Sequence, residues 1–143
     1  MTRVDFYILK DLDTSARHRF ACRLACKATN GGTPVYMNAS DQAMAGEIDD
    51  LLWVYPDQRM IPHGVQGTGL ADGSAVVIGH GLPKQADGLM INLCDEVPGY
   101  FGRFERVAEI VVEANREAGR QAYKFYRDRG FPLYHHDLDE WDG

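Results

Sequence analysis

The stretch VDFYILKDLDTSARHRFACRLACKATNGGTPVYMN, residues 4–38, predicts a strand, a helix and a second strand in that order. Residues 4–9 are rich in aromatic and β-branched side chains, which is typical of a short buried strand. A helix then runs to about Thr29, ends at the Asn-Gly-Gly turn of residues 30–32, and is followed by a strand over residues 34–38. The candidate N-caps of this helix are Asp13, Thr14 and Ser15. Its inward face is predicted to carry Phe20, Leu24 and Ala28.

The alternation of strand and helix continues along the chain. Ser40 or Asp41 caps a second helix that runs to Trp53. This order predicts an α/β fold, because parallel strands need crossover connections and those crossovers are right-handed. We expect one three-layer α/β/α domain with a mostly parallel central sheet, Rossmann-like but without a nucleotide site. The later strands are predicted at residues 75–78, 89–93 and 106–113, with a closing edge segment at 131–138.

The composition fits a single domain, which we place at residues 1–143. A net charge of −6 with 45% hydrophobic residues disfavours direct DNA binding. The odd number of cysteines argues against a disulfide framework and favours a reducing cytoplasm. The sequence predicts neither an export signal nor a membrane span, and we expect the acidic end at residues 137–143 to fray.

The run NREAGRQAYKFYRDRG, residues 115–130, predicts a helix with two different faces. Its basic residues recur at steps of three and four and therefore form one stripe. Such residues also complement the dipole at a helix C-terminus, so a merely solvated face is the alternative. Arginine forks onto carboxylates and the remaining chain is acidic, which favours an anionic, partly apolar protein partner. The stripe comprises Arg116, Arg120, Tyr123, Lys124 and Arg127, and the apolar side comprises Ala118, Ala122, Phe125 and Tyr126.

The residue patterns predict no catalytic set, resident metal or cofactor. The glycine-rich loop at residues 64–73 lacks the Gly-Lys-Ser/Thr that would cradle a phosphate. His63 has no serine or cysteine partner for a triad and is interpreted as a satisfied loop histidine. His18, Cys22 and Cys26 share a helix face, but they do not complete a metal site, so buried thiols are favoured.

Apolar residues cluster at the end of the second helix and in the non-periodic connection that follows it. Each of them taken alone is by default a core residue. Grouped with two prolines, they would instead suit a partner surface, where aromatic and methionine side chains are enriched. Both interpretations stay open on the sequence alone. The cluster comprises Trp53, Tyr55, Met60 and Ile61, with Pro56 and Pro62.

Four motifs occur in an order that belongs to one known family. They are DFYIL at 5–9, DDLLWVYPDQRMIPHG at 49–64, MINLCDEVPGYFGRFERVAEIV at 90–111 and RQAYKFYRDRGF at 120–131. Together they resemble the chi subunit family of bacterial DNA polymerase III, over nearly the whole chain. The resemblance implies a non-catalytic accessory subunit of the clamp-loader assembly, with an α/β fold related to nucleotide-binding domains and with no cofactor.

The resemblance also implies protein partners. One is the acidic C-terminal tail of single-stranded DNA-binding protein, which ends in a phenylalanine carboxylate, and another is the psi subunit, which leads to the clamp loader. A helicase-like partner would compete for the psi surface. Matched by position, the tail-binding residues are Arg116, Arg120, Tyr123, Lys124, Val111 and Lys10, with Arg120 clamping the terminal carboxylate. The psi-binding residues are Trp53, Met60, Ile61 and Pro62, with Met60 where the family usually has phenylalanine.

The sequence leaves two further hypotheses open, one about catalysis and one about the acidic end. The chain could be a nucleotide- or nucleic-acid-dependent enzyme on the same α/β layout, with residues 64–73 as its site, although the missing phosphate loop counts against this. The acidic end, residues 137–142, could also fold back over the basic helix and compete with an acidic ligand there.

Overall fold

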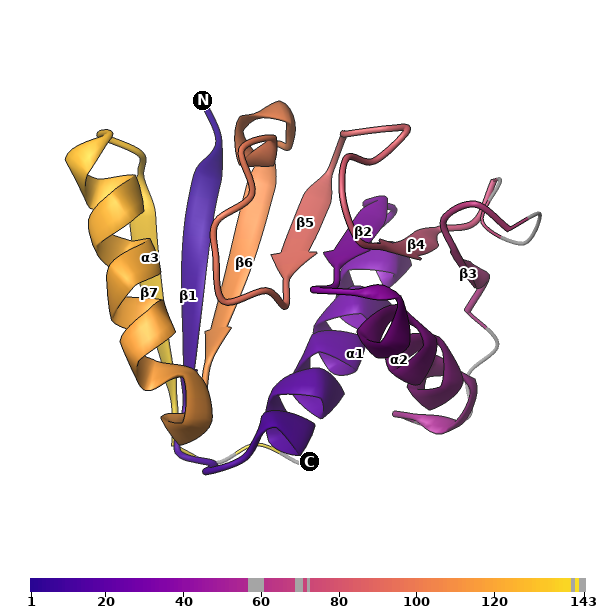
Figure 1. The fold of residues 1–143 in the computed structure, drawn as a ribbon, viewed down its shortest axis with the longest axis horizontal. Helices are drawn as coiled ribbons and strands as arrows, with labels where there is room; N and C mark the ends of the chain where they lie inside the picture. The colour runs from indigo at the N-terminus through magenta and orange to yellow at the C-terminus, as the bar shows by residue number, and fades with distance from the viewer. Residues whose placement is uncertain (57–60, 69–70, 72, 140, 142–143) are drawn as a thin grey trace.

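The computed structural model describes residues 1–56, 61–68, 71, 73–139 and 141. Apart from one short strand, the strands and helices follow one another as the sequence predicts (Figure 1). The strands are β1 (Arg3–Leu9), β2 (Val35–Asn38), β3 (His63–Val65), β4 (Val76–Gly79), β5 (Leu89–Asn92), β6 (Arg106–Val111) and β7 (Leu133–Leu138). The helices are α1 (Thr14–Asn30), α2 (Gln42–Val54) and α3 (Arg116–Asp128), with short 3₁₀ turns η1 (Phe101–Arg103) and η2 (Glu113–Asn115).

All strands of the described chain lie in one sheet, in the order β3-β4-β2-β5-β6-β1-β7. Every neighbouring pair within the described residues is parallel, which confirms the predicted parallel α/β fold. Strand β3 was not predicted. Its three residues, His-Gly-Val, are too few to show a period of two, and they adjoin a glycine-rich loop. β3 and β7 form the two edges of the sheet.

Alternate residues of β1 point into two separate apolar clusters on opposite faces of the sheet. Phe6 packs against Tyr126 of α3, with ring centroids 6.1 Å apart. Tyr7 packs against Phe20 of α1, with ring centroids 5.4 Å apart. Since successive side chains of a strand point to opposite faces, α1 and α3 lie on opposite sides of the sheet. Figure 1 shows α3 on one side and the α1–α2 pair on the other, which confirms the three-layer arrangement.

The face that α1 turns toward the sheet differs from the predicted one. Phe20, Leu24 and Ala28 are only partly buried at the margin of the core. The fully buried face carries small side chains, which let the helix lie close to the sheet and to α2. These residues are Ala16, Ala21, Cys22, Ala25 and Cys26. Both stripes satisfy a helical period, so periodicity alone could not choose between them.

The predicted N-caps are present at the first two helices. The Oδ1 atom of Asp13 accepts a hydrogen bond from the Ala16 amide at 3.1 Å, and Asp41 Oδ1 accepts from the Met44 amide at 2.8 Å. Of the helices in the described part of the chain, none has both the length and the apolar composition needed to cross a bilayer.

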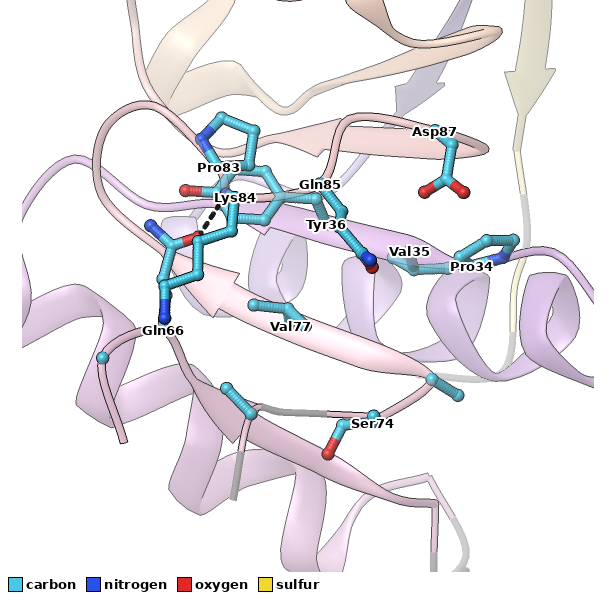
Figure 2. Close-up of a pocket in the computed structure, with 14 residues that line it drawn as sticks. Pro34, Val35, Tyr36, Gln66, Ser74, Val77, Pro83, Lys84, Gln85 and Asp87 are labelled. Carbon is cyan, nitrogen blue, oxygen red and sulfur yellow. Dashed lines mark hydrogen bonds between the residues drawn. The ribbon is translucent and has the colours of Figure 1, made fainter. Parts of the chain in front are cut away.

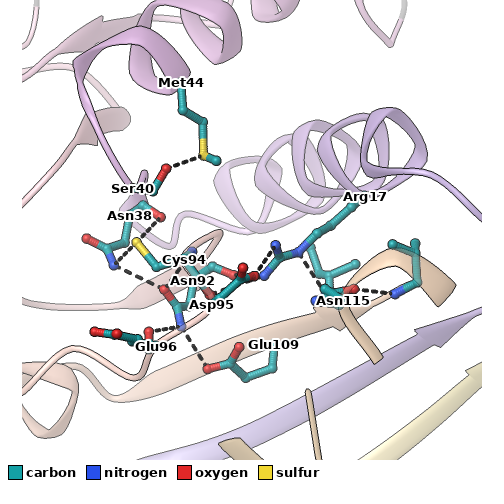
Figure 3. Close-up of polar contacts among 12 residues, drawn as sticks. Arg17, Asn38, Ser40, Met44, Asn92, Cys94, Asp95, Glu96, Glu109 and Asn115 are labelled. Carbon is teal, nitrogen blue, oxygen red and sulfur yellow. Dashed lines mark hydrogen bonds and ion pairs between the residues drawn. The ribbon is translucent and has the colours of Figure 1, made fainter. Parts of the chain in front are cut away.

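A buried polar network joins the carboxyl ends of the central strands (Figure 3). Asn38, the last residue of β2, donates to the Oδ1 atom of Asn92, the last residue of β5, at 3.0 Å. Asn92 in turn donates to Glu109 Oε2 of β6 at 3.0 Å, and Tyr126 of α3 donates to the same oxygen at 2.7 Å. The Tyr100 hydroxyl donates to Asn38 Oδ1 at 2.6 Å. These bonds link the sheet to α3.

Arg17 extends this network from the other side of the sheet (Figure 3). Its side chain is only 4% exposed, and its Nε atom donates to the Ile110 carbonyl at 3.0 Å. A second guanidinium nitrogen donates to the Cys94 carbonyl at 3.3 Å. An ion pair to Asp95 at 3.6 Å offsets the buried charge. In nucleotide-binding α/β folds, ligands bind at the carboxyl ends of strands. Here hydrogen-bonded side chains occupy that region.

Glu109 is the member of the network that titrates. Burial raises its pKa from 4.5 to about 7, and the hydrogen bonds from Asn92 and Tyr126 oppose that rise. The folded protein therefore binds a proton here between about pH 4.5 and 7 that the unfolded chain does not bind. It follows that ionisation of Glu109 lowers the free energy of unfolding as the pH rises through this range.

Replacing Glu109 by Gln should remove this pH dependence, because the amide keeps an oxygen acceptor for Asn92 and Tyr126 but cannot ionise. We expect the stability of Glu109→Gln relative to wild type to rise by roughly 1–3 kcal/mol between pH 5 and pH 8. Urea unfolding of both proteins at the two pH values measures it. The matched control is Glu105→Gln at an exposed position. An equal change in both variants would contradict the assignment.

Candidate functional site

Helix α3 is held close to the sheet by a glycine. A Cβ atom added at Gly119 would lie 2.8 Å from Val111 Cγ2 at the end of β6, closer than side-chain carbons approach one another. Ala122 and Tyr126 are buried on the same side of the helix. The predicted apolar side of α3 is thus confirmed, with Ala118 and Phe125 half-buried. The basic residues occupy the opposite face of α3, which is exposed.

The predicted cations are all on the exposed face of α3. Arg116 pairs with Glu113 at 2.7 Å, and Arg120 faces Glu117 at 3.6 Å, each acid lying three residues earlier. Lys124 has no carboxylate partner among the described residues. Glu113 and Glu117 were not predicted as partners, although the spacing of three residues between acid and arginine could have revealed both pairs.

The apolar residues predicted beside these cations are half-buried. The ring of Tyr123 meets Phe6 at 5.5 Å and His135 at 5.1 Å, so its position is fixed by packing against the sheet edge. Val111 lies directly under Gly119. The structure therefore brings five of the six predicted tail-binding residues to α3 and the end of β6, namely Arg116, Arg120, Tyr123, Lys124 and Val111.

Lys10, the sixth residue, follows the last residue of β1, as predicted. Its Nζ atom lies 3.5 Å from Asp139 Oδ1, and both side chains are largely exposed. The backbone amide of Glu113 donates to the Asp11 carbonyl at 3.0 Å, so the loop that carries Lys10 is attached just before α3 begins. Lys10 is thus at the same end of the sheet as the first turn of α3, but it already has a carboxylate partner.

The apolar cluster at the end of α2 is only partly exposed, because Tyr55 and Ile61 pack against the hydrophobic core. Trp53 is 47% exposed and Val54 is 60% exposed, while Ile61 is half-buried and Pro62 is exposed. We call these four residues the Trp53 surface. Met60, which was also predicted to belong to it, lies outside the described residues. The sequence left open whether Trp53 is a core residue or part of a partner-binding surface. Its exposure favours the partner-binding surface.

The buried His63 side chain contacts the Trp53 surface from the inside of the protein. Its ring meets the Trp53 ring at 4.6 Å, edge to face. Nδ1 lies 2.8 Å from the Ile61 carbonyl oxygen, and Nε2 lies 3.2 Å from the Asp49 carbonyl oxygen. Both ring nitrogens thus face backbone carbonyl oxygens, and an imidazole with one N–H donates to one of them, as expected of a satisfied histidine. His63 thus connects α2 to the start of β3, and its ring holds the Trp53 indole in place on the side that faces the protein.

The glycine-rich loop lines a pocket of about 310 Å³ on the face of β2 and β4 (Figure 2). Tyr36 and Val77 lie between two loops, and the Lys84 amide donates to Gln66 Oε1 at 3.0 Å across the mouth. Among the described lining residues, the charged ones are Lys84 and Asp87.

Three of the loop amides that the structure describes are not available to form a phosphate cradle. The described amides of Thr68, Ala71 and Ser74 donate to the carbonyls of residues three positions earlier, at 3.1, 3.2 and 3.1 Å. They are therefore used within the loop. This geometry counts against the hypothesis of a nucleotide-dependent enzyme with its site at residues 64–73.

His18, Cys22 and Cys26 lie on α1. Burial raises the pKa of the Cys22 thiol to about 12, so this thiol stays protonated, a form that binds metals poorly. Burial also lowers the pKa of His18, whose Nε2 atom is buried without a partner in the described chain. Within the described residues, no three His, Cys, Asp or Glu side chains lie close enough together to hold a metal.

Comparison with known proteins identifies the family of the chain. The family model described as "DNA polymerase III chi subunit, HolC" matches residues 1–134. A relative from Pseudomonas aeruginosa, named DNA polymerase III subunit chi, is 43% identical over 140 residues, covering 96% of this chain and 98% of its own length. A protein of the same name from Haemophilus influenzae is 30% identical, over 90% of this chain and 92% of its own length. The one from Escherichia coli is 28% identical, over 93% of this chain and 96% of its own length. The chain therefore belongs to the chi subunit family of DNA polymerase III.

Proposed function

We propose that this protein is a non-catalytic, cytoplasmic adaptor of DNA replication. In this proposal, α3 binds the acidic C-terminal tail of single-stranded DNA-binding protein, and the Trp53 surface binds the psi subunit and so links the tail to the clamp loader. The single observation that carries the proposal is the exposed basic face of α3, with Arg116, Arg120 and Lys124 on one rigid helix of an acidic chain.

Arg120 is the best placed residue to receive the terminal carboxylate of the tail. Its side chain is 70% exposed, and its guanidinium can fork onto two carboxylate oxygens. Lys124, one turn further along, is available for an aspartate of the tail. Tyr123 and Val111, both half-buried beside these cations, offer apolar surface to the terminal phenylalanine ring.

Glu113 and Glu117 would compete with the tail, because they already face Arg116 and Arg120. Exposed ion pairs of this kind contribute only about 0.2–1 kcal/mol. A tail carboxylate held by several cations at once can therefore displace them. Lys10, paired with Asp139, would contribute only after a similar exchange.

The Trp53 surface has the composition of a protein-binding patch. A half-exposed tryptophan, held edge to face by His63 and flanked by Val54, can bury a large area in a partner without losing many side-chain rotamers. The proposed partner is psi, and a helicase-like protein would compete for the same residues. Met60, Ile61 and Pro62 are the proposed remainder of the contact.

Replacing Arg120 by Ala should weaken tail binding about tenfold or more, since one charge-assisted hydrogen-bonding pair is lost. Fluorescence anisotropy with a labelled acidic peptide ending in Pro-Phe measures this at two salt concentrations. The matched control is Lys27→Ala, an exposed cation on α1 across the sheet, which should leave binding unchanged. Equal affinity of wild type and Arg120→Ala would overturn the proposed site.

Replacing Glu117 by Gln should have the opposite effect. The substitution frees Arg120 from its intrahelical partner and removes a negative charge from the binding face. We expect tail affinity to rise about two- to fivefold at low salt, with the difference shrinking as salt increases. The same anisotropy titration measures it. Unchanged or weaker binding would show that Glu117 does not compete with the ligand.

Replacing Trp53 by Ala should weaken psi binding by about 2 kcal/mol or more while leaving tail binding intact. Calorimetry with purified psi measures the loss, and thermal unfolding checks that the variant is folded. Tyr134→Ala is the matched control, because it removes an exposed aromatic ring from β7 at the opposite edge of the sheet. If both variants bound psi as tightly as wild type, the Trp53 surface would not be the psi site.

A further inference from the structure

A second apolar stripe of α1, beside the fully buried one, lines a cavity next to β7. Phe20, Leu24 and Ala28 recur at four-residue steps, are only partly buried, and lie on the wall of a cavity of about 710 Å³. Residues of β1, β5, β6 and β7 and the side chain of Trp141 supply other parts of the wall. We call this space the α1–β7 cavity. Its volume is within the range of sites that bind small molecules.

Aromatic rings gather at one end of the α1–β7 cavity. The Phe20 ring meets the Trp141 ring edge to face at 5.4 Å and lies 5.4 Å from the Tyr7 ring, which stacks on His136 at 4.7 Å. The Nε1 atom of Trp141 donates to Asp11 Oδ1 at 2.7 Å, which holds the indole in place. The cavity stays open with the indole in this position. These rings offer a preformed surface for a flat ring of a ligand.

The described part of the acidic end lies on this side of the sheet. Asp139 pairs with Lys10 at 3.5 Å, and Trp141 contacts Phe20 of α1. The described part of the acidic end thus docks beside α1 and not over the basic helix α3.

Cationic side chains lie toward the other end of the α1–β7 cavity. Lys27 follows Phe20 by seven residues, which places it about 10 Å further along the helix axis. Arg106 is the first residue of β6, and α1 runs from the carboxyl end of the parallel sheet to its amino end, so both cations lie toward the same end. Arg23, one turn before Lys27, lies between the two groups. No carboxylate is among the described residues that line the cavity.

These cations carry more positive charge than the nearby carboxylates neutralise. Arg23 and Lys27 have no carboxylate partner in the described part of the chain. Arg106 pairs with the buried Asp5 carboxylate at 3.2 Å, but Arg3 pairs with the same carboxylate at 3.0 Å. The result is a local positive excess in a chain whose net charge is −6. A cleft with this charge favours an anionic ligand.

The dipole of α1 gives an alternative reason for a cation at Lys27, near the end of the helix. That reason does not extend to Arg106, which belongs to a strand, or to Arg23, which lies two turns before the helix ends. Free carbonyl oxygens at a helix end would repel an anion. Here the carbonyl oxygens of residues 27–29 accept hydrogen bonds from the amides of residues 31–33.

We propose that the α1–β7 cavity binds a small aromatic phosphate, with the chemistry of a nucleoside diphosphate. The flat ring of the ligand packs against Phe20 and Trp141, and the phosphates, roughly 10 Å away, reach Arg23, Lys27 and Arg106. A phosphate suits this end better than a single carboxylate, because its oxygens accept from several cations at once and arginine forks onto them. The inference is independent of the proposed functions of α3 and of the Trp53 surface.

This site differs from the nucleotide site that is usual in parallel α/β folds. The usual site lies at the carboxyl ends of the strands, which are occupied here by the network around Asn92 and Glu109. The α1–β7 cavity lies on the α1 face of the sheet, and its cations are near the amino ends of the strands. It is also separate from the pocket beside the glycine-rich loop, which has a different lining.

The test uses ADP as the probe and Trp141 as the reporter. In a Trp53→Phe protein, Trp141 is the remaining tryptophan. We expect ADP, without added metal, to change its emission in a saturable way, because the adenine ring packs against the indole. Adenosine should bind at least about tenfold more weakly, since it lacks the phosphates. Inorganic phosphate at the same concentration should not displace ADP, and added salt should weaken ADP binding.

Substitutions on α1 locate the phosphate end of the site. In the same background, Lys27→Ala and Arg23→Ala should each weaken ADP binding at least about tenfold. Arg19→Ala is the matched control on the same helix, because Arg19 does not line the cavity and should leave binding unchanged. Lys84→Ala, in the pocket beside the glycine-rich loop, should also change nothing. Thermal unfolding checks that each variant is folded, and the exposed Lys27 decides the test if Arg23→Ala does not fold.

Four outcomes would overturn the proposal. The first is no saturable response of Trp141 to ADP, and the second is equal binding of adenosine and ADP. The third is a loss of binding in Lys84→Ala with none in Lys27→Ala, which would place the nucleotide in the pocket beside the glycine-rich loop. The fourth is displacement of ADP by oligothymidylate, or by the acidic peptide ending in Pro-Phe, at lower concentrations than unlabelled ADP requires. That result would identify a site for a macromolecule.

Discussion

Every pair of neighbouring strands in the described sheet is parallel, so the chain must return to the same end of the sheet before each new strand can begin. The crossovers α1 and α2 return on one face, and α3 returns on the other. This constraint separates the surfaces of the molecule. The basic face of α3 lies over the β6–β1–β7 side, whereas Trp53 lies at the end of α2 next to the β3 edge. The two proposed binding surfaces therefore lie apart on the molecule.

Much of this architecture could be predicted from short-range patterns. β4 and β5 are continuous apolar runs, and Asp13 and Asp41 mark the helix starts, because burial and capping depend on neighbouring residues. The network around Asn92 and Glu109 was not foreseen. It joins residues of β2, β5, β6 and α3, which are distant in sequence, and a single asparagine after an apolar run does not reveal its partner.

The candidate site was predictable to the extent that it lies on one helix. The cations of α3 follow from helical spacing, as do their pairs with Glu113 and Glu117 once acids are included. Exposure of Trp53 could not be inferred, because a tryptophan at a helix end fits a core as well as a surface. A cavity of about 710 Å³ beside β7 is lined by residues of α1, β1, β6 and β7 together with Trp141, and local periodicity does not record such a combination.

The place of β1 in the sheet has a consequence for how the protein is made. β1 lies between β6 and β7, so both of its hydrogen-bonded neighbours come from the last third of the chain. During synthesis, the first strand to leave the ribosome has no native partner until almost the entire polypeptide has been translated. Contacts between such distant segments must overcome a large loop-closure entropy, which places this chain among slowly folding topologies. The apolar segment Val4–Leu9 is meanwhile an unpaired strand that chaperones can bind.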